Sequence, residues 1–140
     1  MSSERFVGFA DGASHHTCNL PSAAWVIYSP SRQLVALGGA CLGPNSNNVA
    51  EYRVIIEVLW DALSRGITQL EVHLESQLVV SQLNRAYRVR NPILLRQFMQ
   101  IRLLERHFEV ITFNHIPRNQ NSLIDAYANY ILDWHLTHIP

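Results

Sequence analysis

Three short runs near the start of the chain are rich in β-branched and aromatic side chains, a composition typical of strands. They cover Arg5–Ala10, Ala23–Ser29 and Leu34–Leu42. The turn residues Ser29-Pro30-Ser31 separate the second run from the third. The pattern therefore predicts three strands that pair as an antiparallel meander.

A helical period begins after the turn Pro44–Asn48, whose serine and asparagines can cap a helix. Apolar residues then recur at a spacing of three and four residues. They are Ala50, Val54, Ile55, Val58, Leu59, Ala62 and Leu63. Gly66 follows them and ends the predicted helix, because glycine readily adopts the left-handed conformation of a C-terminal cap.

Strands and helices alternate in the second half of the chain. The pattern predicts a strand at Leu70–Leu74, helices at Ser76–Leu83 and from Asn91-Pro92 to about His107, a strand at Glu109–Ile116 and a helix from Asn119 to about His135. A meander followed by such alternation indicates an α/β fold. We expect a mixed five-stranded sheet, three antiparallel strands followed by two parallel ones, with helices on both faces. No repeat or linker-like segment interrupts the pattern, so residues 1–140 are expected to form a single domain.

The composition suits a folded protein outside the membrane. Hydrophobic residues make up 48% and charged residues 16% of the 140 residues. The first residues lack the apolar stretch of a secretory signal, and no apolar run approaches the ~18 residues of a membrane span. We therefore expect an intracellular protein with no membrane association. Cys18 and Cys41 could pair or remain free thiols, and neither has a partner at zinc-site spacing.

Basic residues are unevenly placed, although the formal net charge is zero. All eleven are arginines, and four of them lie in one short stretch that contains no acid: Arg85, Arg88, Arg90 and Arg96. A guanidinium group presents a fixed fork of donors suited to phosphate oxygens. The stretch is therefore either a nucleic-acid contact or the solvated surface of a helix and loop.

Four acidic residues occupy the ends of predicted elements. Asp11 closes the first strand, Glu51 lies in the first turn of the first helix, Glu75 closes the fourth strand, and Asp125 lies early in the last helix. Singly, each has an ordinary explanation as a turn residue, a helix-dipole partner or a surface charge. Together at one edge of a sheet they would repel one another unless cations lay between them, and Mg²⁺ prefers such ligands. Two Mg²⁺ ions could activate a water and stabilise the leaving oxygen of a phosphodiester.

The motifs around these acids resemble those of ribonuclease H. They are Phe9–Ser14, Ser46–Tyr52, Glu75–Val80 and His115–Asn129, and they follow the family's order. The similarity runs from about Phe6 to Leu132 and is greatest to the archaeal-like, plant-type branch of the type 1 enzymes. That branch also supplies domains of plant long-terminal-repeat retroelements. The resemblance implies a ribonuclease H-like fold and an endonuclease that hydrolyses the RNA strand of RNA–DNA hybrids by a two-metal-ion mechanism.

The resemblance also implies which residues are catalytic. The four carboxylates that would hold two Mg²⁺ ions, or Mn²⁺ as a substitute, are Asp11, Glu51, Glu75 and Asp125. His115 and Arg118 lie in the region of a mobile residue that assists product release in the family. We favour Arg118 for this role, because His115 is expected to lie in a strand and to pack inward.

The substrate contacts follow from the same motifs. Asn47 and Asn48 correspond to residues that touch the bases of the hybrid from the minor groove. Arg88 and Arg90 lie where the family has basic residues that face the phosphates of the DNA strand. Further contacts to the substrate are expected from Gly12, Ala13 and Ser14. The implied partner is an RNA–DNA hybrid, bound by a monomeric domain. The domain is either a standalone enzyme or a part of a larger reverse-transcriptase polyprotein.

One departure from the family pattern affects the third carboxylate. Glu75 stands where ribonuclease H has aspartate, so the carboxylate keeps its charge but gains one methylene of reach. Mg²⁺ tolerates little deviation from octahedral geometry, and a misplacement of about 1 Å can cost on the order of a hundredfold in rate. The alternative to an active nuclease is therefore a catalytically impaired nucleic-acid-binding or structural domain of a retroelement polyprotein. The retained carboxylates argue against a purely structural role.

Overall fold

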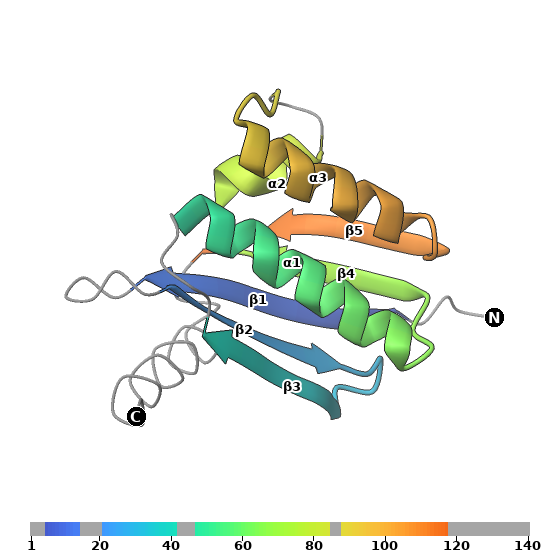
Figure 1. Ribbon diagram of the computed structural model, residues 1–140. Coiled ribbons are helices and arrows are strands. Elements are labelled where there is room, and N and C mark those ends of the chain that lie inside the picture. Colours follow the sequence, from blue (N-terminus) through green and yellow to red (C-terminus); the bar gives the residue numbers. More distant parts are fainter. Residues whose placement is uncertain (1–4, 15–20, 42–46, 85–87, 118–140) are drawn as a thin grey trace.

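The computed structural model describes residues 5–14, 21–41, 47–84 and 88–117. Its strands are β1 (Phe6–Ser14), β2 (Pro21–Tyr28), β3 (Leu34–Cys41), β4 (Gln69–Leu74) and β5 (Val110–His115). They form one sheet in the order β3-β2-β1-β4-β5 (Figure 1). The pairs β1–β2 and β2–β3 are antiparallel, whereas β1–β4 and β4–β5 are parallel. The mixed five-stranded sheet predicted from the sequence is therefore confirmed.

The described helices lie on one side of this sheet (Figure 1). They are α1 (Asn47–Ser64), α2 (Gln77–Leu83) and α3 (Pro92–Glu105). Helix α1 contacts β1, β2 and α3, and α2 contacts β5. None of these helices is long and apolar enough to cross a membrane. The helix predicted from Asn119 to about His135, which would supply the second covered face, lies outside the described residues.

Short sequence signals mark the start of α3 and the end of α1, as predicted. Asn91 caps α3, because its side-chain oxygen accepts hydrogen bonds from the backbone N–H groups of Ile93 and Leu94 at 2.9 and 3.2 Å. Pro92 follows at the first helical position, where no intrahelical N–H is needed. Gly66 follows the C-terminal end of α1 with a φ of 76°, in the left-handed region that favours glycine.

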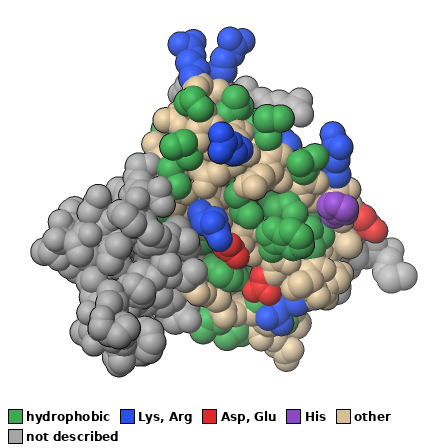
Figure 2. Space-filling model, viewed as in Figure 1, with side chains coloured by type: hydrophobic (Ala, Val, Ile, Leu, Met, Phe, Trp, Pro, Cys, Tyr) green, Lys and Arg blue, Asp and Glu red, His purple; other side chains and the backbone are tan. Residues whose placement is uncertain are grey.

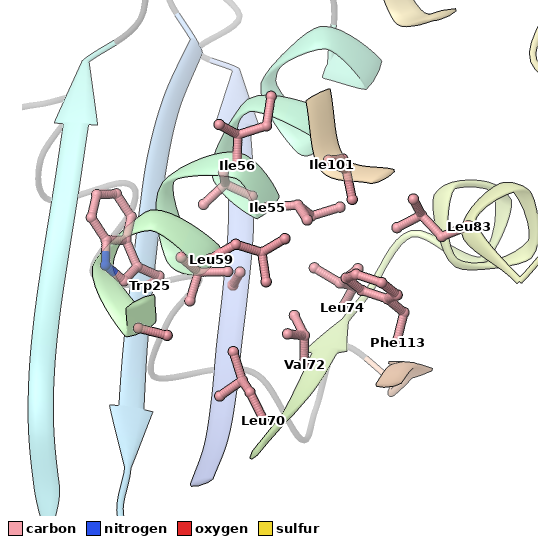
Figure 3. Packing of buried hydrophobic residues seen from close by; sticks show 14 of the residues in the cluster. Trp25, Ile55, Ile56, Leu59, Leu70, Val72, Leu74, Leu83, Ile101 and Phe113 are labelled. Carbon is pink, nitrogen blue, oxygen red and sulfur yellow. The ribbon is translucent and has the colours of Figure 1, made fainter. Parts of the chain in front are cut away.

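The core lies between α1 and the sheet. Figure 3 shows Ile55 and Leu59 of α1 directed toward Leu70, Val72 and Leu74 of β4. All five side chains are buried. Burying them removes apolar surface from water, which is the main favourable contribution to folding. This packing holds α1 against the sheet and fixes the position of every residue that α1 carries.

A second contact fastens α1 to the other half of the sheet. The indole N–H of Trp25 on β2 donates to Oδ2 of Asp61 on α1 at 2.8 Å. The ring of Trp25 lies across Gly38 of β3, where a Cβ would meet ring atoms at 2.2 Å. Glycine is therefore required at position 38 by the close approach of the indole.

Two element boundaries differ from the prediction and change the placement of acids. Strand β1 continues to Ser14 through its pairing with β2, so Asp11 lies inside the strand and not at its end. Helix α1 begins at Asn47, so the asparagines Asn47 and Asn48, which were expected in the preceding turn, belong to its first turn. Glu51 is therefore the fifth residue of α1, and the first turn contains no acid.

Candidate active site

Asp11 and Glu75 lie at matching positions on neighbouring strands. The parallel pairing of β1 with β4 ends at Ala10 and Leu74. Asp11 directly follows Ala10, and Glu75 directly follows Leu74. Asp11 is 5% exposed, so its carboxylate is held within the protein. Glu75 is half-buried and is followed by Ser76, whose side chain caps α2 by accepting from the N–H of Val79. The backbone at Glu75 is thus held between the end of a strand and the start of a helix.

Glu51 lies at the same end of the sheet. A Cβ on Gly8 of β1 would be 3.6 Å from Cγ2 of Val58, so α1 crosses β1 closely at this point. Glu51 precedes Val58 by seven residues, or about 10 Å along a helix. Asp11 follows Gly8 by three residues, or about 10 Å along a strand. Because α1 and β1 run in opposite directions (Figure 1), Glu51 and Asp11 both lie about 10 Å from this crossing, toward the same end of the sheet.

The donors at this end of the sheet are of the kind that hard cations prefer. Asp11 is buried, and atom Oε2 of Glu51 is shielded from solvent. Carboxylate oxygens are the protein ligands typical of Mg²⁺. Within the described part of the chain, however, no three acidic, histidine or cysteine side chains form a group that would hold a metal ion. The fourth predicted carboxylate, Asp125, lies outside the described residues, as does Arg118.

The predicted substrate-contacting residues of two motifs surround these acids. Gly12, Ala13 and Ser14 continue β1 beyond Asp11 and pair with Ala23, Ser22 and Pro21 of β2. Asn47 and Asn48 form the start of α1, and the side chain of Asn48 is exposed. Both motifs thus lie at the end of the sheet that carries Asp11.

The predicted phosphate contacts lie on the connection between α2 and α3. Arg88 and Arg90 are exposed and lie three residues and one residue before Asn91, the cap of α3. Figure 2 shows basic side chains that project from this end of the molecule. The structure thus leaves these guanidinium groups accessible to a ligand.

His115 corrects one expectation. It does lie in a strand, as predicted, but its side chain is exposed and does not pack inward. The reason is that His115 is the last residue of β5, paired with Leu74, where the sheet ends. The preference for Arg118 rested on the burial of His115, so that argument is wrong, and His115 is accessible next to the strand end that carries Glu75.

A buried polar pair next to Glu51 in the chain was not anticipated from the sequence. The hydroxyl of Tyr52, which is fully buried, donates to Oε1 of Gln82 on α2. Burial raises the pKa of Tyr52 to about 12, and the positive charge of Arg102 opposes the shift, so the hydroxyl keeps its proton. One signal was available. Gln82 follows Val79 by three residues, which places it on the buried side of α2.

Comparison with known proteins identifies relatives along nearly the whole chain. A family profile described as "Reverse transcriptase-like" matches residues 9–131. Ribonuclease HI of Halobacterium salinarum is 36% identical over 129 residues, which cover 92% of this chain and 65% of that protein. A bifunctional protein of Mycobacterium tuberculosis is 34% identical over 125 residues, which cover 89% of this chain and 34% of that protein. The chain therefore spans less than two thirds of the length of these curated relatives.

Solved structures agree with these sequence matches. The crystal structure of RNase H1 from Halobacterium salinarum has a TM-score of 0.87 and 36% identity, covering 92% of this chain and 98% of that one. The structure of LC11-RNase H1 in complex with an RNA/DNA hybrid has a TM-score of 0.88 and 28% identity, covering 94% of this chain and 99% of that one. The fold implied by the sequence motifs is confirmed: this chain belongs to the reverse transcriptase-like family and has the ribonuclease H fold.

Proposed function

We propose that this chain is an endonuclease that hydrolyses the RNA strand of RNA–DNA hybrids. The observation that carries the proposal is the placement of Asp11 and Glu75, one residue beyond the last pair of adjacent parallel strands, with Glu51 at the same level of α1. The similarity to ribonuclease HI, and to an RNase H1 solved with a hybrid, supports the same activity. Acids gathered at a sheet end are suited to phosphodiester chemistry assisted by metal ions.

The chemistry requires divalent cations, which we propose are two Mg²⁺ ions, with Mn²⁺ as a substitute. Asp11, Glu51, Glu75 and Asp125 would hold them through carboxylate oxygens. When bound, the ions lower the pKa of a water and stabilise charge on the phosphate oxygens. The protein's own part is to keep Asp11 and Glu51 partly shielded from bulk water, where their charges act more strongly on a bound cation.

The residues around the acids would orient the hybrid. Asn48 is exposed at the start of α1, next to Asn47, and both would approach base edges from the wide minor groove. Arg88 and Arg90 would contact phosphates of the DNA strand, which positions a duplex without reading its sequence. Because 2′-hydroxyl groups distinguish RNA from DNA in such a groove, one strand alone would be cut. His115, exposed beside the strand end, would assist product release together with Arg118.

The biological setting is part of the proposal. Similarity to the halobacterial protein supports the archaeal-like, plant-type branch of the family. The description of the matching family as reverse transcriptase-like supports a place in a retroelement polyprotein. We propose that the domain acts inside the cell and binds its substrate as a monomer.

A substrate panel tests the activity. RNA labelled at one end would be presented as a hybrid with DNA, as a single strand and as an RNA duplex, each with Mg²⁺, Mn²⁺ or excess chelator. We expect cleavage of the hybrid alone and only with a cation. Equal cleavage of single-stranded RNA would contradict the hybrid specificity. Hybrid binding without cleavage under either cation would instead favour the impaired binding domain that Glu75 suggests.

A further inference from the structure

Three consecutive residues at the end of α2 each bond to a different element. Gln82 accepts from the hydroxyl of Tyr52 on α1. The carbonyl of Leu83 accepts from the guanidinium of Arg102 on α3. Asn84 donates through Nδ2 to the carbonyl of Phe113 on β5 at 3.1 Å. Each bond therefore ties α2 to one neighbouring element, and the bond from Tyr52 is the one that ties it to α1.

The first of these bonds joins the two segments that carry acids. Tyr52 directly follows Glu51 on α1. Gln82 lies on α2, a helix of seven residues that begins just after Glu75 and its capping residue Ser76. A helix of this length spans about two turns, or about 10 Å. A displacement of α2 relative to α1 would therefore change the separation of Glu75 from Glu51.

The surroundings of the pair are apolar, so two apolar side chains could take its place. Tyr52 is fully buried and Gln82 is 8% exposed, and their neighbours Val79 and Leu83 are part of the hydrophobic core. A buried amide lowers stability unless it is hydrogen-bonded, and a matched apolar pair of similar shape would be about as stable. Stability alone does not call for a polar pair here, whereas a directional bond fixes one relative position of the two helices.

We propose that Tyr52 and Gln82 are positioning residues, whose hydrogen bond sets the separation of Glu51 from Glu75 and with it the affinity of the site for divalent cations. This inference rests on the proposed function. Neither residue is expected to touch the substrate, because both are buried. Removal of partners that orient metal ligands typically weakens metal binding 10- to 100-fold, which gives the scale of the effect.

The test separates positioning from stability by removing both polar groups at once. Tyr52→Phe alone leaves the amide of Gln82 without its partner, so it is expected to lower stability as well as metal binding. The double variant Tyr52→Phe/Gln82→Leu replaces the pair with apolar groups and should unfold at a denaturant concentration close to that of the wild type. Trp25→Phe removes the part-buried hydrogen bond between β2 and Asp61 of α1, and it serves as the control for a lost hydrogen bond between α1 and another element.

Three experiments would be done on each protein. They are denaturant unfolding, calorimetric binding of Mn²⁺ without substrate, and cleavage kinetics (kcat and KM) on a labelled hybrid across a Mg²⁺ titration. We expect the double variant to bind Mn²⁺ about tenfold more weakly and to need about tenfold more Mg²⁺ for half-maximal cleavage. Its KM for the hybrid at saturating Mg²⁺ should match the wild type, and Trp25→Phe should retain wild-type metal binding.

The possible failures point to different conclusions. A double variant that binds Mn²⁺ and responds to Mg²⁺ like the wild type would overturn the positioning role and leave the proposed nuclease intact. Equal loss of Mn²⁺ binding in Trp25→Phe would overturn it as well, because the effect would then follow from any destabilisation. A wild-type protein that neither binds Mn²⁺ nor cleaves the hybrid would overturn the proposed function and this inference together.

Discussion

Asp11 and Glu75 lie at the same level, each directly after the last residue pair of the β1–β4 ladder. Adjacent strands lie about 4.8 Å apart, so the two backbones approach one another closely at this point. The length of each side chain then decides where its carboxylate lies. Position 75 carries glutamate, whose side chain is one methylene longer than that of the aspartate expected there from the ribonuclease H motif.

Shortening this side chain should increase the activity supported by Mg²⁺. The backbone at position 75 is held by β4 and by the Ser76 cap, so Glu75 can shorten its reach only through a less favoured rotamer, at about 0.5–1.5 kcal/mol. We expect Glu75→Asp to raise the Mg²⁺-dependent rate about tenfold, equivalent to about 1.4 kcal/mol in the barrier. Because Mg²⁺ demands near-ideal octahedral geometry, Mn²⁺ should tolerate the displaced carboxylate better and support more activity than Mg²⁺ in the wild type. Rates of both proteins on one hybrid, across a titration of each metal, provide the check. A variant no faster than the wild type at saturating Mg²⁺ would mean that the site accommodates Glu75.

Removing the exposed arginines before α3 should weaken hybrid binding to a similar extent for all sequences. Arg88→Ala and Arg90→Ala each remove one phosphate contact, which carries no sequence information. Each loss should make the dependence of log affinity on log salt shallower by somewhat under one unit. Arg65→Ala, at the far end of α1 and paired with Asp61, is the matched control and should leave the slope unchanged. Unchanged slopes for Arg88→Ala and Arg90→Ala would identify a solvated surface instead.

Gly38→Ala should destabilise the fold strongly. The added Cβ would lie 2.2 Å from ring atoms of Trp25, so the indole must move and its bond to Asp61 would be disturbed. Overpacking of this kind costs about 1–3 kcal/mol, and we expect a value at the upper end. Gly66→Ala is the control, because its Cβ meets nothing within 4 Å and only the positive φ is strained, at about 1 kcal/mol. Denaturant unfolding of the three proteins measures the difference, and equal losses in both variants would contradict the packing argument.

The features that follow from the sequence alone are local ones. Asn91, Pro92 and Gly66 determine helix ends through contacts within a few residues, so their effects could be read from the sequence. The pairing of Ala10 with Leu74 depends on how two distant strands align, and no local pattern fixes that register. The exposure of His115 follows from where β5 stops, a limit that hydrophobic alternation defines poorly.

In the candidate site, too, the local features could be predicted from the sequence and the long-range contacts could not. The acids were found because their types and motifs are visible in the sequence. Their surroundings were not, since the bond between Tyr52 and Gln82 joins residues 30 positions apart. Contacts across such separations arise only when helices pack on the sheet, and a residue's own neighbours in the sequence do not reveal them.

His73 should make the protein less stable in mild acid. It is half-buried on β4 and stacks on Phe9 with ring centroids 5.1 Å apart. Burial lowers the pKa of His73 below its ordinary value of about 6.5, although Glu71, which also pairs with Arg5, opposes the shift. As the pH falls below about 6.5, the unfolded chain takes up this proton before the folded protein does. Stability is therefore lost as the pH falls from the ordinary pKa to the lowered one. Above that window His73 is neutral in both states, and its effect on stability no longer depends on pH.

The variant His73→Phe tests this assignment, because it keeps an aromatic ring against Phe9 and removes the titrating group. Denaturant midpoints would be measured for both proteins at pH 7.5 and pH 5.5. We expect the wild type to lose more stability than the variant over this interval. Parallel losses in the two proteins would show that other groups cause the acid sensitivity.

Asp11→Asn tests the central claim most directly. The substitution keeps the size of a side chain that is 5% exposed and removes only its charge, so the fold and the denaturant midpoint should be retained or slightly raised. The measurement is the rate of cleavage of a labelled RNA–DNA hybrid in saturating Mg²⁺ by the wild type and by the variant, with hybrid affinity determined in parallel. We predict cleavage by the wild type, which chelator abolishes, and no detectable cleavage by a variant that still binds the hybrid. Near-normal cleavage by Asp11→Asn would contradict the assignment of the site.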